Sequence, residues 1–250
     1  MKKQFSGSFS YKKDIGKVRD SNEDDTKVVV NSKSDVLMVV ADGMGGCLKG
    51  EFASSKIVEY LTTSFLESPT FLTTLSIKNW ISKKLKKVNK LIYNKSFKEP
   101  EFHGMGSTAI VAILHHNKLV IANIGDSRAY ILNKKEFVQI SEDQTYVNYL
   151  FNSGLIKEEE KSTHPDRHVL TNAIGIYPSV SIEFHTLQYD KESIFLCSDG
   201  LYNNLKNNDI ENILRTDDDS ETKVKNLINL ANYNGGSDNI SVALRECLDD

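Results

Sequence analysis

The chain has 250 residues, of which 39% are hydrophobic and 26% charged, which is typical of a globular protein with one large core or two small ones. Its formal net charge of −3 excludes a strong overall attraction to nucleic acid or to anionic membranes. No apolar run approaches the ~20 residues that span a bilayer, and the first residues lack the apolar stretch of a signal peptide. Cys47, Cys197 and Cys247 are an odd number at unrelated spacings, which suits reduced thiols, so we expect a cytoplasmic protein.

The first part of the chain predicts three strands followed by two helices. The strands are expected at 5–11, 26–31 and 36–41. Both helices have apolar residues at steps of three or four positions, which indicates one buried face each. These residues are Ala53, Ile57, Leu61 and Phe65 in the first helix, and Ile77, Ile81, Leu85, Val88 and Ile92 in the second. The lysines between positions 83 and 87 fall between core positions, which favours a solvated face.

The rest of the chain predicts a second, similar block. Strands at 106–114, 118–125 and 127–133 follow one another so closely that they must form an antiparallel meander. A polar, irregular stretch over 141–180 then contains a short helix at 145–153. A strand at 192–198, helices at 207–215 and 219–233 and a final strand complete the pattern. Two blocks of strands, each with a pair of helices and no Pro- or Gly-rich linker between them, predict two sheets packed face to face in a single domain, with the helices outside.

Four aspartates each lie at one end of a predicted apolar strand, beside a small residue. They are Asp42, Asp126, Asp199 and Asp238. Alone, each Asp-Gly or Asp-Ser pair indicates only a turn. Because the ends of adjacent strands converge, their repetition predicts a cluster of carboxylates at one rim of the sheets. Such a cluster raises the pKa of its members and needs a cation, and a hard divalent metal is the simplest candidate.

Several other chemistries lack their motifs. The sequence has no G-x-x-x-x-G-K-[ST] loop, no H-E-x-x-H motif and no arginine six residues after Cys47 or Cys197. Carboxylates without histidine or thiolate partners favour Mg²⁺ or Mn²⁺. The segment DIGKVRDSNEDD adds Arg19, whose planar fork suits phosphate, and the acids Glu23 and Asp24. We therefore expect a metal centre that activates water and polarises a phosphoryl or acyl oxygen.

Seven segments then support a resemblance to a known family: VRDSNEDD, VVADGMGG followed by GEFAS, GSTA, ANIGDSRAY, HVLTNAIG, FLCSDGL and GGSDNISV. In their order and approximate spacing the chain resembles the metal-dependent protein phosphatases of type 2C, most of all their short bacterial branch. The resemblance covers about residues 5–246. It implies an α+β fold, a four-layer α-β-β-α sandwich, with a binuclear Mn²⁺ or Mg²⁺ centre that hydrolyses phosphoserine and phosphothreonine in proteins.

The resemblance also implies roles for individual residues. Asp42 would bridge the two metals, and Asp199 and Asp238 would complete the shell of the first. The Gly43 carbonyl would bind the second metal, which Asp24, or less well Glu23, would reach through water. A third, looser ion would lie between Asp126 and Asp199, and Arg19 would bind the substrate phosphate. Residues 144–170 resemble the mobile flap of the family.

The chain departs from the family where many members have a histidine. Met44 and Cys47 occupy those positions, so either water or the Cys47 thiol would have to protonate the leaving serine. Two other functions stay open: a binuclear hydrolase of small phosphate esters or nucleotides, and a non-catalytic adaptor that binds phosphoproteins. We expect a monomer whose partners are phosphoproteins, substrates of a serine/threonine kinase, and neither nucleic acid nor membranes.

Overall fold

The structure, a computed structural model, describes residues 7–46 and 48–247. Its elements form two antiparallel sheets. The first sheet has the order β1-β11-β10-β7-β8 and the second the order β2-β3-β5-β6-β9, with β4 paired to β3. The strands are β1 Gly7–Asp14, β2 Asp24–Val30, β3 Val36–Met44, β4 Gly106–Ser107, β5 Ala109–His115, β6 Lys118–Ile124, β7 Arg128–Leu132, β8 Phe137–Gln139, β9 Glu183–Gln188, β10 Ser193–Cys197 and β11 Ile240–Cys247.

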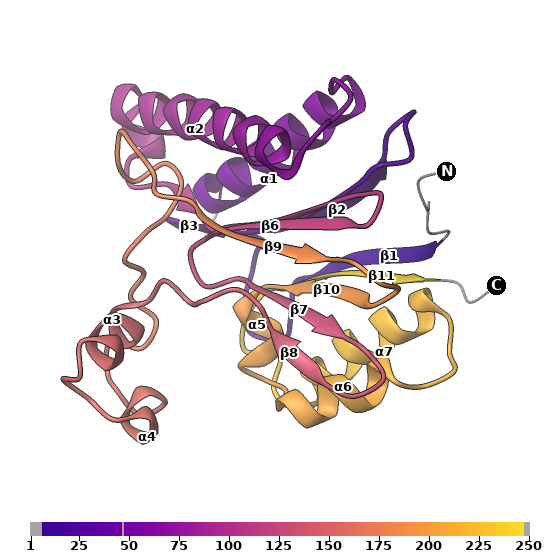
Figure 1. Ribbon diagram of the computed structural model, residues 1–250. Helices are drawn as coiled ribbons and strands as arrows, with labels where there is room; N and C mark the ends of the chain where they lie inside the picture. The colour runs from indigo at the N-terminus through magenta and orange to yellow at the C-terminus, as the bar shows by residue number, and fades with distance from the viewer. Residues whose placement is uncertain (1–6, 47, 248–250) are drawn as a thin grey trace.

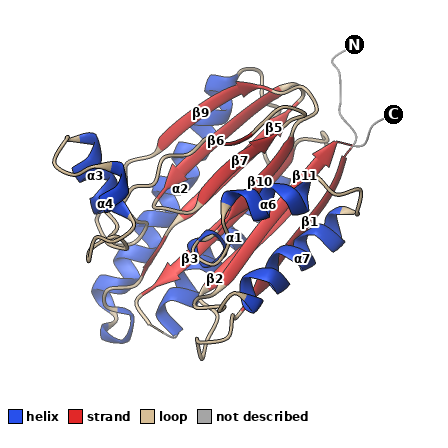
Figure 2. Ribbon diagram, turned by 90° about the horizontal axis from the view of Figure 1, so that it is seen from below, coloured by secondary structure: helices blue, strands red, loops and turns tan. Residues whose placement is uncertain are grey.

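Helices cover the outer face of each sheet, as Figure 1 shows. Their bounds are α1 Leu48–Leu66, α2 Thr74–Lys98, α3 Tyr146–Asn152, α4 Glu158–Lys161, α5 Asp199–Tyr202, α6 Asn207–Leu214 and α7 Ser220–Tyr233, with a short 3-10 turn at Pro100–Phe102. Helices α1 and α2 pack on the second sheet, and α6 and α7 pack on the first. Seen from below, α6 and α7 lie in front of the stacked strands (Figure 2). The molecule is therefore a four-layer α-β-β-α sandwich.

Alternate side chains of each central strand point to opposite faces of its sheet, which explains how one strand contacts two layers. In β5, Val111 and Ile113 pack against the helical layer, whereas Ile110 and Ala112 face the other sheet. The strand is buried along its whole length because both of its faces are covered. The sequence for this strand is accordingly a continuous apolar run rather than an alternation of polar and apolar residues.

The helical spacing read from the sequence places the predicted residues in the core. Ala53, Ile57, Leu61 and Phe65 of α1 and the five apolar residues predicted for α2 are all fully buried. Helix α2 begins with a capping box in which the Thr73 side chain accepts from the backbone of Ser76. Within residues 7–46 and 48–247, no helix combines the length and apolar character needed to cross a lipid bilayer.

The predicted three-stranded meander over 106–133 is wrong, because β5 and β6 pair in the second sheet whereas β7 pairs with β10 and β8 in the first. The sequence analysis also missed two strands. β8 and β9 are edge strands, at the ends of the two strand orders, and both contain polar residues. An edge strand has one open side, so its sequence does not need a buried pattern. The first predicted strand, at 5–11, lies partly outside the described residues and continues to Asp14 in the structure.

Candidate metal centre

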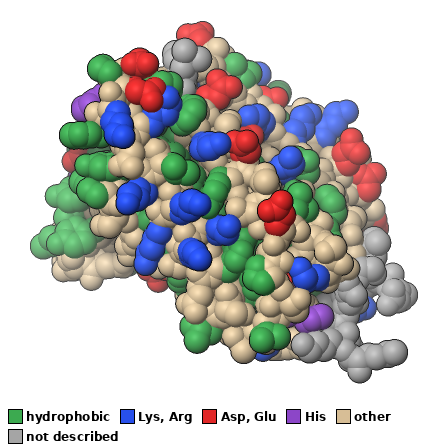
Figure 3. All heavy atoms as spheres, turned by 90° about the horizontal axis from the view of Figure 1, so that it is seen from above, with side chains coloured by type: hydrophobic (Ala, Val, Ile, Leu, Met, Phe, Trp, Pro, Cys, Tyr) green, Lys and Arg blue, Asp and Glu red, His purple; other side chains and the backbone are tan. Residues whose placement is uncertain are grey.

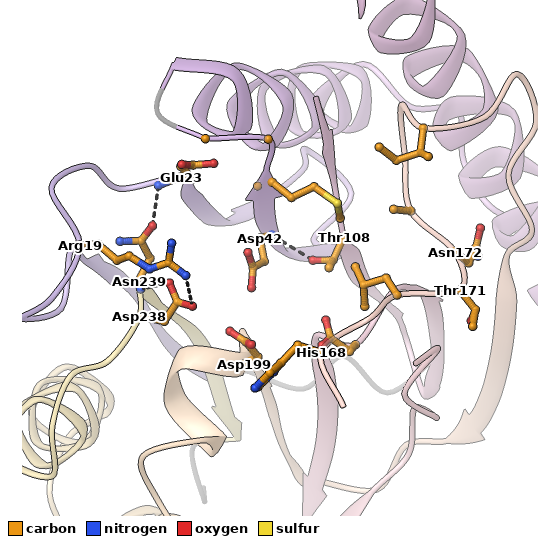
Figure 4. A pocket seen from close by; sticks show the side chains of 18 of the residues that line it. Arg19, Glu23, Asp42, Thr108, His168, Thr171, Asn172, Asp199, Asp238 and Asn239 are labelled. Carbon is orange, nitrogen blue, oxygen red and sulfur yellow. Dashed lines mark hydrogen bonds and ion pairs between the residues drawn. The ribbon is translucent and has the colours of Figure 1, made fainter. Parts of the chain in front are cut away.

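A cavity of about 460 Å³ opens where the predicted acids meet (Figure 4). Its wall contains every predicted site residue except Asp24. These wall residues are Arg19, Glu23, Asp42, Gly43, Asp126, Asp199 and Asp238. Residues from five separate parts of the chain thus share one cavity, as the repeated strand-end acids predict.

Asp42 lies in β3, whose backbone is held on both sides at this point. On one side it pairs with Asp24 of β2, and on the other the Thr108 hydroxyl accepts a hydrogen bond from the Asp42 amide at 3.0 Å. The Thr108 amide in turn donates to the Asp42 carbonyl at 2.9 Å. The Asp42 carboxylate is thereby carried on rigid backbone and points into the cavity (Figure 4).

Glycine is required where β3 passes into α1. A Cβ on Gly43 would lie 2.2 Å from the carbonyl oxygen of Gly50, and one on Gly50 would lie 1.8 Å from the Glu23 carboxylate. The Gly43 amide also donates to the Glu23 carbonyl at 3.1 Å. These contacts hold the segment containing Glu23 against the turn, and any side chain at Gly43 or Gly50 would push it away.

Asp199 and Asp238 reach the cavity from the first sheet. Asp199 begins α5 directly after β10, and Asp238 lies just before the neighbouring strand β11. Asn239, to which the sequence analysis assigned no role, ties this corner together. Its side chain accepts from the Glu23 amide at 2.8 Å and donates to the carbonyl of Ser21 at 2.9 Å. Asn239 thus fixes the loop that contains Arg19 and Glu23.

Arg19 lies at the edge of the cavity and forms an ion pair with Asp238, with 2.8 Å between Nη2 and Oδ2. The arginine side chain is about half exposed, so a ligand in the cavity can reach it. Its planar fork has several further N–H donors, which suits contact with a phosphate.

Asp126, in the turn between β6 and β7, is supported by neighbours on two elements. The Tyr202 hydroxyl of α5 donates to the Asp126 carbonyl at 3.1 Å, and the Arg128 guanidinium lies 3.5 Å from the centre of the Tyr202 ring. Arg128 is held in turn by a bidentate contact with Asp143. Tyr202 therefore connects the element of Asp199 to the turn of Asp126, a link that the sequence analysis did not predict.

Glu23 and Asp24 are adjacent in the sequence but have different surroundings. Glu23 lines the cavity, whereas Asp24 is buried between the sheets and accepts from the Ser198 hydroxyl at 2.7 Å. The other carboxylate oxygen of Asp24, Oδ1, has no hydrogen-bond partner among the described residues. The geometry thus favours Glu23 over Asp24 for direct access to the cavity.

The acids raise one another's pKa. Burial raises the pKa of Asp42 well above its usual range, and the charges of Asp24, Asp199 and Asp126 raise it further. Burial is also the main cause for Asp126, whose pKa rises to about 8, and for Asp24, whose pKa rises to about 7. A cation bound between these buried carboxylates would stabilise their charged form.

The donor set fits a hard divalent cation. It consists of carboxylate oxygens and a backbone carbonyl, the ligands that Mg²⁺ and Mn²⁺ prefer, and the buried Oδ1 of Asp24 has no hydrogen-bond partner among the described residues. In the described part of the chain, no three acidic, histidine or cysteine side chains converge closely enough to enclose one ion. The carboxylates surround the cavity rather than meeting at one point.

His168 is a cavity residue that the sequence analysis missed. It lines the wall, and Figure 4 shows its ring beside Asp199. Burial and Asp238 raise the pKa of Asp199, whereas the nearby charges of His168 and Arg19 oppose that rise. His168 begins the segment HVLTNAIG, which is far in the sequence from the Asp-Gly pair where many family members have a histidine. Cys47, the thiol considered there as a proton donor, lies outside the described residues.

His168 belongs to a segment that projects from the sandwich (Figure 1). Residues 144–170 are closed at their base by a bridge between Thr145 and Leu170, and the Tyr146 amide donates to the Val169 carbonyl at 2.8 Å. Helices α3 and α4 form the distal part. The base lies at the cavity, which both His168 and Leu170 line.

Comparison with known proteins assigns this architecture to a family. The sequence profile described as protein phosphatase 2C matches residues 17–246. The serine/threonine phosphatase stp of Listeria welshimeri is 35% identical over 237 residues, which make up 94% of this chain and 94% of that protein. The crystal structure of serine/threonine phosphatase Stp1 from Staphylococcus aureus has a TM-score of 0.91 and 31% identity, covering 100% of this chain and 98% of that one.

One further structure contains metal. The catalytic domain of the serine/threonine protein phosphatase PstP in complex with two manganese ions has a TM-score of 0.84 and 28% identity, covering 97% of this chain and 99% of that one. The chain thus shares its fold with solved serine/threonine phosphatases. The chain belongs to the protein phosphatase 2C family. The resemblance, the sandwich fold and the enzyme class predicted from the sequence are confirmed.

Proposed function

We propose that the chain removes phosphate from phosphoserine and phosphothreonine side chains of proteins by attack of water in the carboxylate-lined cavity. Family membership makes it a protein serine/threonine phosphatase. The observation that supports this chemistry most directly is the convergence of Asp42, Asp126, Asp199 and Asp238 on one cavity that Arg19 also lines. Carboxylates repel the negative charge of a phosphate. The cavity therefore needs a bound cation before it can hold a phosphate.

Two divalent cations, Mn²⁺ or Mg²⁺, would fit the donors of this cavity, and PstP holds two manganese ions. Asp42 would be shared by both ions. The remaining ligands would be Asp199 and Asp238 on one side, the Gly43 carbonyl with Glu23 or Asp24 on the other, and Asp126 with Asp199 for a third, looser ion. When bound, such cations lower the pKa of water and neutralise charge on phosphoryl oxygens.

The other residues of the cavity would bind the substrate and move a proton. Arg19 would exchange its ion pair with Asp238 for the phosphate oxygens, since a cation on Asp238 removes the charge that now holds it. His168 would donate a proton to the departing serine or threonine oxygen, because it is the imidazole that lines the cavity. This differs from the sequence-based expectation, which considered water and Cys47.

Residues 144–170 would act as a flap that reads the substrate, within a single phosphatase domain over 1–250. The base of this segment is closed by hydrogen bonds, and its surface includes the acidic run Glu158, Glu159 and Glu160. Segments of this kind beside a cavity commonly select substrates. The substrates would be cytoplasmic proteins phosphorylated by a serine/threonine kinase, and the enzyme would act as a monomer.

Turnover of a phosphothreonine peptide, measured with Mn²⁺ and with a chelator, tests this proposal. We expect turnover only with metal, and a loss of at least about a hundredfold in Asp199→Asn, because a neutral amide is a poor ligand and cannot offset cation charge. Asp217→Asn, an exposed aspartate in the turn before α7, is the matched control and should keep full activity.

Three outcomes would contradict the proposal. Metal-dependent turnover by Asp199→Asn at the wild-type rate would refute the site assignment. Faster hydrolysis of nucleotides than of phosphopeptides would indicate a hydrolase of small esters. Binding of the phosphopeptide without turnover would indicate an adaptor.

A further inference from the structure

Helix α2 has a charge unlike that of the rest of the molecule. Its 25 residues include eight lysines and no acidic residue. The net charge of the chain, −3, is therefore the sum of +8 on this helix and −11 on all other residues. The lysine run noted in the sequence thus belongs to a longer basic surface that the overall charge conceals.

Five of these lysines are exposed and define what we call the α2 lysine face: Lys83, Lys86, Lys87, Lys90 and Lys98. Within residues 7–46 and 48–247, the one ion pair that any lysine of α2 forms is the pair between Lys95 and Glu99. Lys83, Lys86 and Lys90 lie three or four positions apart, a spacing at which like charges destabilise a helix. Lys87 lies 5.8 Å from the centre of the Tyr60 ring, but among the described residues no ion pair offsets the repulsion between Lys83, Lys86 and Lys90.

Large apolar side chains lie among these lysines. Leu75 is 64% exposed, Leu91 45% and Phe97 78%, and all three belong to α2. Tyr93 stacks on Phe97 with 6.4 Å between ring centres. Figure 3, which looks down on the layer formed by α1 and α2, shows blue side chains gathered on this face with green side chains between them. A face with both exposed cations and exposed apolar groups is complementary to a surface that is anionic and has an apolar layer beneath its charges.

We propose that the α2 lysine face docks the protein onto membranes rich in anionic phospholipid. Lysines near such a membrane are attracted to its negative surface, and leucine and phenylalanine side chains enter the boundary between headgroups and acyl chains. The net charge of −11 on all other residues is repelled by the same surface, so this helix would be the part that faces the membrane. The inference goes beyond the proposed phosphatase activity and does not depend on it.

Two features favour a lipid surface over nucleic acid. Every cation of α2 is a lysine, whereas recognition of nucleic acid favours the planar fork of arginine. Leu75 and Leu91 would find no apolar partner on the sugar-phosphate backbone of a nucleic acid. Docking through α2 would also leave the enzyme able to act, because no residue of α2 lines the carboxylate-lined cavity.

Sedimentation with vesicles of phosphatidylcholine, with and without about one-third phosphatidylglycerol, tests the proposal. We expect binding only to the anionic vesicles, with a loss of about tenfold or more when salt is raised, because salt screens surface charge. Combined Lys83→Glu, Lys86→Glu and Lys90→Glu substitutions should abolish binding. Combined Lys134→Glu, Lys135→Glu and Lys225→Glu substitutions cause the same change of net charge at exposed positions outside α2, and should bind like the wild type.

The apolar contribution is tested separately with Leu91→Ser combined with Phe97→Ser, which should weaken binding severalfold while all lysines remain. In every variant, turnover of a small aryl phosphate and the midpoint of thermal unfolding should match the wild type, which shows that the fold is intact. Equal loss of binding in the control triple variant would overturn the proposal. Binding of duplex DNA or RNA as tight as that of anionic vesicles would overturn it in favour of a nucleic-acid surface.

Discussion

At the residue scale, the cavity contains aspartates that repel one another and one arginine, Arg19, which forms an ion pair with Asp238. The ion pair between Arg19 and Asp238 places the guanidinium at the cavity before any ligand arrives. Side-chain entropy that is lost in this pair does not have to be lost again when a phosphate binds. The Arg19 side chain also remains about half exposed, so a ligand in the cavity can reach it.

Arg19→Ala should therefore raise KM for a phosphopeptide about tenfold or more and change kcat less, because a contact made in both ground and transition states contributes uniform binding. Steady-state kinetics with a phosphothreonine peptide measure both constants, and Arg19→Lys should recover part of the affinity. An unchanged KM in Arg19→Ala would show that the arginine does not contact the substrate.

His168→Gln should slow hydrolysis of a phosphoserine peptide by about tenfold to a hundredfold, because the alkoxide leaving group needs a proton. The effect on a nitrophenyl phosphate should be small, since nitrophenolate leaves without one. The ratio of the two rates is the measurement, and His164→Gln, in the same segment but outside the cavity wall, is the control. A similar loss on both substrates would assign His168 to binding or to the shape of the cavity.

At the element scale, the segment 144–170 joins a closed base to an exposed acidic end. The base is held by the pairing of Thr145 with Leu170, and α4 begins with three glutamates, all exposed. Glu160 also accepts from the Lys157 amide at 2.7 Å, so it stabilises the start of that short helix. Glu158 and Glu159 are thus the better positions at which to change charge without disturbing the segment.

Glu158→Lys combined with Glu159→Lys should shift selectivity toward acidic phosphopeptides by about threefold to tenfold at low salt, because repulsion is replaced by attraction. The ratio of kcat/KM for an acidic and a basic phosphopeptide measures this shift, while the rate on a small aryl phosphate should stay constant. Glu136→Lys combined with Glu221→Lys is the matched control on other elements. An equal change on peptides and aryl phosphate would contradict a substrate-reading role.

At the scale of the whole molecule, the cluster of acids makes stability depend on pH and metal together. The pKa values of Asp24 and Asp126 rise to about 7 and about 8 in the folded protein, whereas an unfolded aspartate has a pKa near ~3.9. Between these values the folded state binds more protons than the unfolded state, so the contribution of these acids to stability falls as pH rises. A divalent cation in the cavity would offset this loss.

Mn²⁺ should therefore raise the midpoint of thermal unfolding by several degrees more at pH 8 than at pH 5, where protons compete with the metal. Scanning calorimetry of the metal-stripped and metal-loaded protein at both pH values measures the difference. In the metal-free protein, Asp126→Asn should weaken the pH dependence, because one of the raised acids is removed. Equal effects of Mn²⁺ at both pH values would show that the metal does not bind to these carboxylates.

Much of the fold is determined by local periodicity in the sequence. The apolar residues of α1 and α2 recur with the helical period, and all of those predicted are buried. The acids Asp42, Asp126, Asp199 and Asp238 could be placed together because each lies at one end of an apolar strand, and these ends gather at one rim of the two packed sheets. The edge strands β8 and β9 were missed since a strand with one open side does not need an apolar pattern.

Only the tertiary structure decided which of two residues adjacent in the sequence faces the cavity. Glu23 and Asp24 are adjacent and equally acidic, but Glu23 lies just before β2 and lines the cavity, whereas Asp24 is buried and accepts from the Ser198 hydroxyl. His168 lines the same cavity as Asp199 although the two lie far apart in the sequence, and no local pattern encodes that approach. The sequence by itself determined the elements of the core and the chemistry at their ends, because both depend on periodicity and residue type. Register and long-range packing then decided which of those side chains meet.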